Sequence, residues 1–181
     1  QTDTSNGDWF FSENDRYKTP AQVLTMLADI VSKNGNLLLN VVQRADGTLV
    51  PESDRLLTEM AAWMKVNAEA IHGTRPWKVY GEGPTQAASG AFQEDTAYTA
   101  QDIRFTTRAG TLYALTLGEP KGSVKMASLR RGNAHETRAV RRVELLGAGP
   151  LRFRQDGQAL EVDMPERLPS RHVSALRVTF G

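Results

Sequence analysis

The chain has 181 residues, of which 40% are hydrophobic and 24% charged, and its formal net charge is +1. An apolar fraction of this size is ordinary for a globular protein and excludes extensive disorder. The near-neutral charge gives no electrostatic reason to expect nucleic acid or an anionic membrane as a partner. The lack of cysteine excludes disulfides and thiolate chemistry.

The first predicted element is a helix that begins near residue 20. It follows a polar, loop-like segment with three aromatic residues at positions 9–11. Threonine, proline and glutamine in the sequence TPAQ (residues 19–22) suit the cap, the first helical position and a capping box, respectively. Apolar residues at helical spacing continue to Val31, and Asn34-Gly35 predicts the helix end.

A buried strand is expected next, over residues 36–42. This run is nearly all apolar and too short for an ordinary helix, and the flanking glycine and Asp46-Gly47 favour a strand. A helix followed by such a strand is half of a parallel βαβ repeat. The repeat cannot stand alone, because a parallel strand needs neighbours on both edges and helices on both faces. The chain is therefore expected to be the tail of a larger α/β enzyme.

A second helix is expected from Ser53 or Asp54 to Gly73. Lys65 and Glu69 are spaced for an ion pair on its outer face. Its inner face is expected to hold Leu56, Leu57, Met60, Trp63, Met64 and Ile71.

The pattern changes beyond residues 74–84, a junction rich in glycine and proline. Turn signals such as Ala109-Gly110 and Asp156-Gly157 separate a series of short apolar segments. This regular spacing predicts an antiparallel sandwich. The expected strands are 101–106, 111–117, 123–128, 139–146, 151–154, 159–163 and 173–180.

Four segments in order resemble the bacterial α-L-fucosidases of glycoside hydrolase family 29. The first is QTDTS at residues 1–5 followed by GDWF at residues 7–10. The second is LTMLADIVSKNGNLLLNV at residues 24–41, and the third is DGT at residues 46–48. The fourth, WMKVNAEAIHGTRPW at residues 63–77, resembles the family's segment that leads out of its barrel.

This resemblance implies an α/β plus all-β fold. Residues 1–83 would be the terminal βα repeats of a (β/α)8 catalytic barrel, and residues 84–181 the family's C-terminal antiparallel β-sandwich. The implied reaction is hydrolysis of terminal α-linked L-fucose from a glycan, with retention and without a cofactor or metal. The family's nucleophilic Asp lies upstream, and its general acid/base in one branch lies near the place of Gln1, which cannot transfer a proton. No catalytic residue is therefore assigned here, and the isolated chain is expected to be inactive.

Trp9 is the candidate substrate-binding residue. Barrel active sites lie in the loops at the carboxyl ends of the strands, and an aromatic face can pack against the apolar C5-methyl side of fucose. Packing on the barrel rim is the alternative, and both interpretations stay open.

The other polar residues near this loop favour structural roles. Asp8, Glu13 and Asp15 are more consistent with solvated loop charges than with a catalytic carboxyl pair. Asn40 is expected to fix the loop that follows its strand by a hydrogen bond rather than to contact substrate, and Arg44 to be a solvated rim residue. The three histidines are far apart in sequence, and none has zinc-binding spacing.

A second hypothesis treats the sandwich as a non-catalytic carbohydrate-binding or structural module. Arg130-Arg131 and residues 138–142 form a basic patch, for which a solvated face is favoured over a polyanionic glycan site. Most aromatic residues of this part fall within strand patterns, which favours core packing over a sugar-binding platform. They are Phe92, Tyr98, Phe105, Tyr113, Phe153 and Phe180.

The expected partner is a fucosylated glycan, with no nucleic acid and no membrane. A periplasmic or secreted location is the expectation implied by the family's usual glycan-scavenging role.

Overall fold

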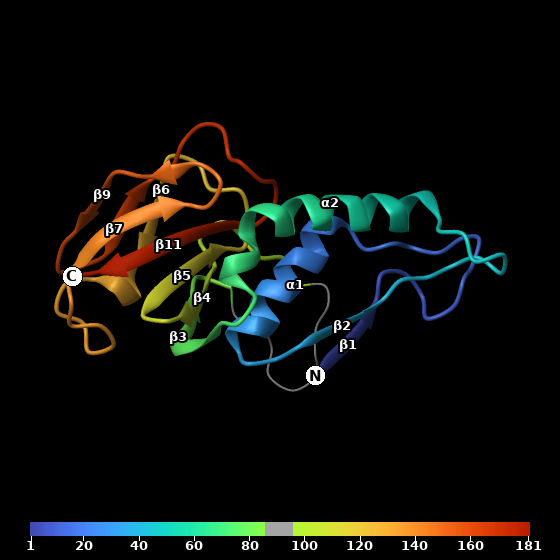
Figure 1. The fold of residues 1–181 in the computed structure, drawn as a ribbon, viewed down its shortest axis with the longest axis horizontal. Coiled ribbons are helices and arrows are strands. Elements are labelled where there is room, and N and C mark those ends of the chain that lie inside the picture. Colours follow the sequence, from blue (N-terminus) through green and yellow to red (C-terminus); the bar gives the residue numbers. More distant parts are fainter. Residues whose placement is uncertain (86–95) are drawn as a thin grey trace.

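The computed structural model describes residues 1–85 and 96–181. Two helices lie between a small parallel sheet and a larger assembly of antiparallel strands (Figure 1). The helices are α1 (Pro20–Ser32) and α2 (Pro51–Asn67), with single 3-10 turns at η1 (Ala68–Ala70) and η2 (Ala127–Leu129). The strands are β1 (Thr2–Ser5), β2 (Leu37–Asn40), β3 (Arg75–Glu82), β4 (Ile103–Arg108), β5 (Thr111–Thr116), β6 (Ser123–Met126), β7 (Val140–Leu145), β8 (Gly149–Pro150), β9 (Phe153–Gln155), β10 (Leu160–Asp163) and β11 (Ser174–Phe180).

Helix α1 begins with the predicted capping box. The Thr19 hydroxyl accepts from the Gln22 amide at 3.3 Å, and the Gln22 side chain accepts from the Thr19 amide at 2.8 Å. At the other end Asn34 adopts the left-handed conformation, with φ of 67°. Both ends of the helix are thus determined by local sequence.

Strands β1 and β2 pair in parallel, with Thr2 opposite Leu37 and Ser5 opposite Asn40. Leu37 and Leu39 pack against an apolar cluster of Val23, Met26, Ile30 and Leu56 from the two helices. Leu38 points away from that cluster and is 54% exposed. One face of this two-stranded sheet is therefore covered by helices, while the other is open. The predicted strand at residues 36–42 is confirmed in type and is shorter at both ends.

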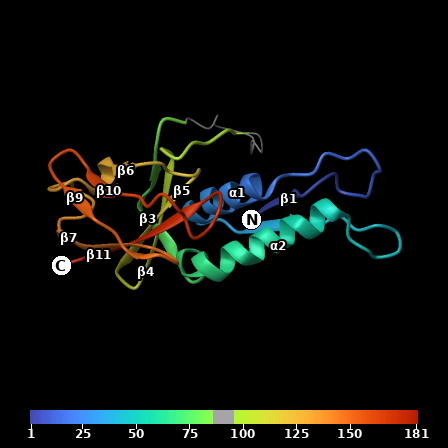
Figure 2. The same cartoon turned by 90° about the horizontal axis from the view of Figure 1, so that it is seen from above.

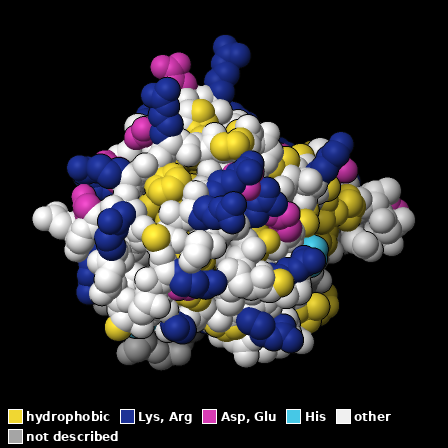
Figure 3. All heavy atoms as spheres, turned by 60° about the vertical axis from the view of Figure 1, so that its left-hand side comes forward, with side chains coloured by type: hydrophobic (Ala, Val, Ile, Leu, Met, Phe, Trp, Pro, Cys, Tyr) yellow, Lys and Arg dark blue, Asp and Glu magenta, His cyan; other side chains and the backbone are white. Residues whose placement is uncertain are grey.

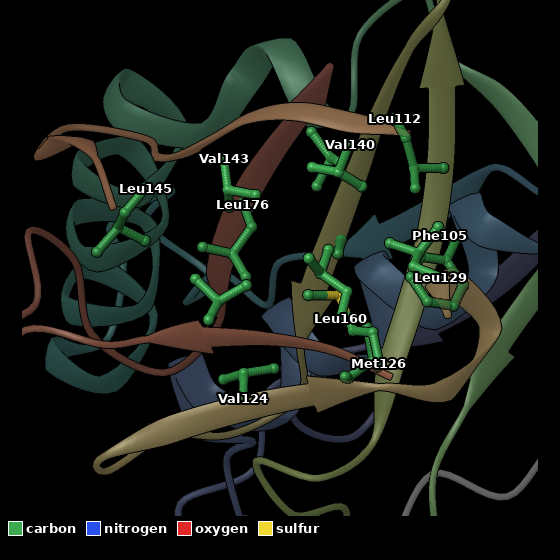
Figure 4. Packing of buried hydrophobic residues seen from close by; sticks show 14 of the residues in the cluster. Phe105, Leu112, Val124, Met126, Leu129, Val140, Val143, Leu145, Leu160 and Leu176 are labelled. Atoms are coloured by element: carbon green, nitrogen blue, oxygen red, sulfur yellow. The ribbon is translucent and has the colours of Figure 1, made fainter. Parts of the chain in front are cut away.

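The strands after α2 form two antiparallel sheets. Their orders are β3-β4-β5-β11-β7-β8 and β6-β10-β9. Side chains of both sheets interdigitate in one core, where Phe105, Leu112 and Leu176 of the larger sheet meet Met126 and Leu160 of the smaller (Figure 4). Alternating strands with one face toward a partner sheet form a sandwich. The coarse expectation of a β-sandwich is therefore confirmed.

The other face of the six-stranded sheet packs against the helices, as the view from above also shows (Figure 2). Leu24 and Trp63 bury their side chains among Leu115, Val173 and Ala175. The Trp63 indole N–H donates to the Val173 carbonyl at 2.7 Å, so its polar group is satisfied inside the apolar contact.

A buried ion pair crosses the same interface. Arg104 on β4 donates through Nε to Asp29 Oδ1 on α1 at 2.6 Å, and its side chain is only 6% exposed. Lys33, one turn further along α1, contacts the second carboxylate oxygen at 2.8 Å. The Tyr98 ring lies 5.0 Å from the Arg104 guanidinium carbon and adds a cation–π contact. Asp29 therefore neutralises a charge that the sheet would otherwise bury alone.

Four details of the sequence-based prediction need correction. Helix α2 begins at Pro51 rather than at Ser53 or Asp54, because proline occupies its first turn. Leu57, expected on the inner face, is 38% exposed. Glu69 pairs with Arg177 of β11 at 3.3 Å and not with Lys65.

The fourth correction concerns the junction at residues 74–84. It contains β3, which pairs with β4 through an irregular register in which Gly81 approaches the backbone of Ile103 closely. A Cβ at position 81 would lie 2.5 Å from the Ile103 carbonyl oxygen, so glycine is required by contact rather than by a loop. The division of the chain at residue 83 stays a prediction.

The aromatic residues of the sandwich are mainly core residues, as expected. Phe105 and Tyr113 are buried, Phe153 and Phe180 pack on the sandwich core, and Tyr98 packs on the helix–sheet cluster. Phe92 lies outside the described residues. Among the residues described, no helix is both long enough and apolar enough to cross a bilayer.

Replacing Asp29 by alanine should destabilise the chain by about 3–5 kcal/mol, because it leaves the Arg104 guanidinium buried without its carboxylate. Urea denaturation followed by tryptophan fluorescence measures this change. The matched control is Lys33→Ala, which removes the exposed partner of the same carboxylate and should cost less than about 1 kcal/mol. Equal effects of the two substitutions would contradict the assigned role of the buried pair.

Candidate functional site

Two loops meet at one edge of the small parallel sheet. Residues 6–19 follow β1, and residues 41–50 follow β2. Because the strands are parallel, both loops leave from the carboxyl ends and lie together (Figure 1). We call these two loops the rim.

Asn6 joins the two rim loops to the start of α2. Its side chain is fully buried, donates to the Ser53 hydroxyl at 2.7 Å and accepts from the Val42 amide at 3.0 Å. Its backbone donates to the Asn40 carbonyl and accepts from the Lys18 amide. The sequence pattern did not single out Asn6, because the partners that define its role are distant in the chain.

Asn40 also fixes the rim, as its position at the end of β2 suggested. Its side-chain amide donates to the Ser5 hydroxyl at 2.9 Å and to the Trp9 carbonyl at 3.3 Å. The loop that it holds is the one after β1, whereas the expectation was the loop that follows its own strand.

The carboxylates of the first rim loop are engaged with backbone amides. Asp15 accepts from the amides of Asp8 and Arg16 at 2.6 and 2.7 Å, and Asp8 accepts from the Trp9 amide at 2.7 Å. Gly7 permits this fold, since a Cβ there would lie 2.2 Å from an Asp15 oxygen. Asp8 and Glu13 are exposed, as expected of solvated loop charges, and Asp8 and Asp15 in addition shape the loop through these bonds.

The rim presents an exposed aromatic group. Trp9 is 51% exposed, Phe10 85% and Phe11 40%. Neighbouring large apolar side chains that remain in contact with water mark a surface that meets another molecule or another part of a protein. The structure thus places Trp9 beside the carboxyl ends of both strands, where the sequence predicted it.

The pKa values of two rim residues, Tyr17 and Asp46, are shifted by burial and by hydrogen bonds within the loops. Burial raises the pKa of the Tyr17 phenol above its usual value, and the nearby Asp15 charge adds to that effect. The backbone amide of Thr48, followed by its hydroxyl, lowers the pKa of Asp46, which forms the turn at Asp46-Gly47. Arg44 donates to the Leu49 carbonyl at 2.7 Å and so braces its own loop.

No group of three or more metal-ligating side chains occurs within residues 1–85 and 96–181. The histidines lie in three different settings. The His72 backbone carbonyl accepts from Arg108, the His135 ring stacks edge-on to Trp77, and His172 pairs with Glu59 at 3.0 Å. The rim therefore supplies apolar contact area, and the Asp8 and Asp15 carboxylates bind backbone amides of its first loop.

Comparison with known proteins identifies this arrangement. Residues 1–69 match the family model described as Alpha-L-fucosidase. The chain is related to the alpha-L-fucosidases. An alpha-L-fucosidase of Branchiostoma floridae is 30% identical over 79% of this chain, and the tissue alpha-L-fucosidase of Homo sapiens is 26% identical over 83%. The chain spans 28% of the length of each of these two relatives.

Solved fucosidase structures extend the likeness to the sandwich. The alpha-fucosidase of Thermotoga maritima in complex with a mechanism-based inhibitor has a TM-score of 0.75 and 26% identity, over 98% of this chain and 39% of its own. Alpha-L-fucosidase isoenzyme 1 of Paenibacillus thiaminolyticus gives 0.73 and 25%, over 99% and 39%. The matched part is the fucosidase C-terminal region. The sequence resemblance is thereby confirmed, and it now includes residues 84–181.

Replacing Asn6 by alanine should destabilise the chain by about 1–3 kcal/mol, since it leaves the buried Ser53 hydroxyl and Val42 amide unpaired. Urea denaturation measures the loss. Asn36→Ala is the control, because that side chain is exposed at the opposite end of β2. If Asn6→Ala changed stability no more than the control, Asn6 would not be the residue that joins the rim to α2.

Proposed function

We propose that this chain is the C-terminal part of a retaining glycoside hydrolase that releases terminal α-linked L-fucose from glycans. The observation that supports this proposal most is the parallel pair β1–β2, because the rim with its exposed aromatic residues lies at the carboxyl ends of these strands. The relationship to the alpha-L-fucosidases supports the choice of sugar. In this proposal β1 and β2 are strands of a (β/α)8 barrel, and α1 and α2 are its outer helices.

Within the described part of the chain, the small parallel sheet has only two strands, and this supports the proposal that β1 and β2 belong to a barrel. Parallel sheets occur almost only with several strands and with covered edges. Here each strand has one partner among the described residues, and Leu38 on the open face is an apolar side chain of the kind that fills a barrel interior. A barrel supplies the missing neighbours on both edges and buries this face.

In the proposed site Trp9 packs its ring against the apolar C5-methyl side of fucose. The backbone of this loop is held on both sides, by Asn40 at the Trp9 carbonyl and by Asp8 at the Trp9 amide. Such bracing limits the conformational entropy that the loop loses when sugar binds. Trp9 is therefore proposed as a substrate-binding residue.

The catalytic carboxylates are proposed to lie on residues outside this chain. A retaining glycosidase needs two carboxyl groups about 5–5.5 Å apart, one ionised to attack and one protonated to donate. Asp8 and Asp15 already accept hydrogen bonds from backbone amides of their own loop, which gives them a structural role there. The reaction needs no cofactor, and a periplasmic or secreted location fits the scavenging of external glycans.

The isolated chain is expected to show no turnover of an aryl α-L-fucoside, because both catalytic carboxylates would be absent. Release of the chromophore is measured with the 181-residue chain and with a longer protein that contains it. Turnover by the isolated chain above the buffer rate would refute the proposal that the catalytic pair lies elsewhere.

In the longer protein, Trp9→Ala should lower kcat/KM for an aryl α-L-fucoside by about tenfold, since it removes one aromatic contact with the sugar. Trp9→Phe should recover part of this loss. The control is Leu57→Ala, which shortens an exposed apolar side chain on α2, outside the two rim loops. A Trp9→Ala enzyme with unchanged kcat/KM would assign Trp9 to rim packing.

A further inference from the structure

The helices cover only part of the six-stranded sheet. On the face toward the helices, Leu115 and Ala175 are buried beneath α1 and α2. The cross-strand pairing continues this face beyond the helices, with Arg108 opposite Thr111 and Thr179 opposite Arg142. The end of the sheet that carries these residues lies away from the rim, near the C-terminus (Figure 1).

A network of charged side chains is built into this uncovered face. Arg142 contacts Glu144 Oε1 at 2.6 Å, and Arg177 contacts Glu144 Oε2 through Nε at 2.9 Å and NH2 at 2.7 Å. A further contact at 3.3 Å joins Arg177 to Glu69 of η1. Burial alone would raise the pKa of Glu144. The guanidiniums of Arg177 and Arg142 favour its ionised form and hold this pKa below its usual value. The arginines are therefore held in place by a carboxylate that stays charged.

A shallow hollow of about 460 Å³ lies over this network. Arg141, Arg142 and Arg177 line it together with the hydroxyl residues Thr111 and Thr179. Within the described residues the Arg141 side chain makes no hydrogen bond or ion pair, so its guanidinium donors are available. Glu144 and Glu69 together offset two of the three guanidiniums, which leaves the hollow with a net positive charge.

The charge of the whole sandwich part has the same sign. Residues 84–181 carry fourteen Lys and Arg against ten Asp and Glu, whereas residues 1–83 carry eight against eleven. Figure 3 shows the end of the molecule that bears the sandwich, where Lys and Arg side chains outnumber acidic ones. The near-zero net charge of the chain therefore conceals two halves of opposite sign, and the positive half attracts anions toward the hollow.

We propose that this hollow is a second carbohydrate site, which binds an acidic saccharide bearing sulfate or carboxylate groups. Guanidiniums recognise such groups by paired, charge-assisted hydrogen bonds, and threonine hydroxyls can bond to sugar hydroxyls. The volume suits one or two sugar units, which favours a saccharide over the long phosphate track of a nucleic acid. This site is separate from the rim and does not depend on the proposed catalysis. It would hold the protein on acidic glycans.

The test measures binding of the 181-residue chain to a fluorescein-labelled chondroitin sulfate hexasaccharide by fluorescence anisotropy. Neutral maltohexaose and an oligothymidylate of equal charge are used as competitors. The chain should bind the sulfated probe, and maltohexaose should not displace it. The oligothymidylate should compete at least tenfold more weakly than unlabelled chondroitin sulfate hexasaccharide.

Two variants locate the site. Arg141→Gln with Arg142→Gln should weaken binding by roughly tenfold or more, since two charge-assisted contacts are lost. The matched control changes Arg130 and Arg131 to Gln, which removes the same charge from an exposed turn outside the hollow and should change affinity less than about twofold. Arg141→Gln alone guards against misfolding of the double variant, because Arg141 has no partner within the described chain.

Three results would overturn the proposal. The first is no binding of the sulfated probe at about 0.15 M salt, a condition that screens non-specific attraction. The second is an equal loss of affinity in the Arg130/Arg131 control, which would indicate a diffuse effect of charge. The third is equal competition by oligothymidylate, which would make the surface a general polyanion site.

Discussion

The contact between the two helices and the six-stranded sheet is the interaction on which the rest of this structure depends. It joins segments that are far apart in the sequence, and it contains both an apolar cluster and the buried pair of Asp29 with Arg104. Apolar burial supplies most of the stabilisation, while the ion pair neutralises the two charges that this contact buries. The helices in turn cover one face of β1 and β2. The six-stranded sheet therefore positions the rim indirectly, through the two helices.

This chain of contacts explains why a sandwich accompanies the rim. Two parallel strands and two helices have too little apolar surface to be stable alone. Trp63 buries its ring against the sheet and donates to the Val173 carbonyl, which extends the core of the helical part into the sandwich. The sandwich therefore acts as a structural brace, and its uncovered end remains available for another role.

The sequence allowed local features to be predicted well. The capping box at Thr19 and Gln22, the left-handed Asn34 and most of the alternating strands follow from short-range rules of backbone geometry. Partners distant in sequence could not be predicted in this way. Glu69 is spaced for an ion pair with Lys65, yet it pairs with Arg177, which the folding of the sheet brings near.

The strand at Arg75–Glu82 was missed because its glycine and proline suggested a loop, whereas close backbone approach explains Gly81. For the site, Asn40 was singled out at the end of an apolar strand, and Trp9 by the family resemblance, which implies a barrel loop there. Asn6 is recognisable only from its buried partners.

The central claim is that the rim faces fucose at the carboxyl ends of barrel strands. A crystal structure of the longer protein that contains this chain, with L-fucose bound, tests it most directly. The account predicts that the Trp9 ring lies within about 4 Å of the sugar, and that β1 and β2 each gain a second parallel neighbour. Fucose bound away from the rim, or outer edges of β1 and β2 left open to solvent, would contradict it.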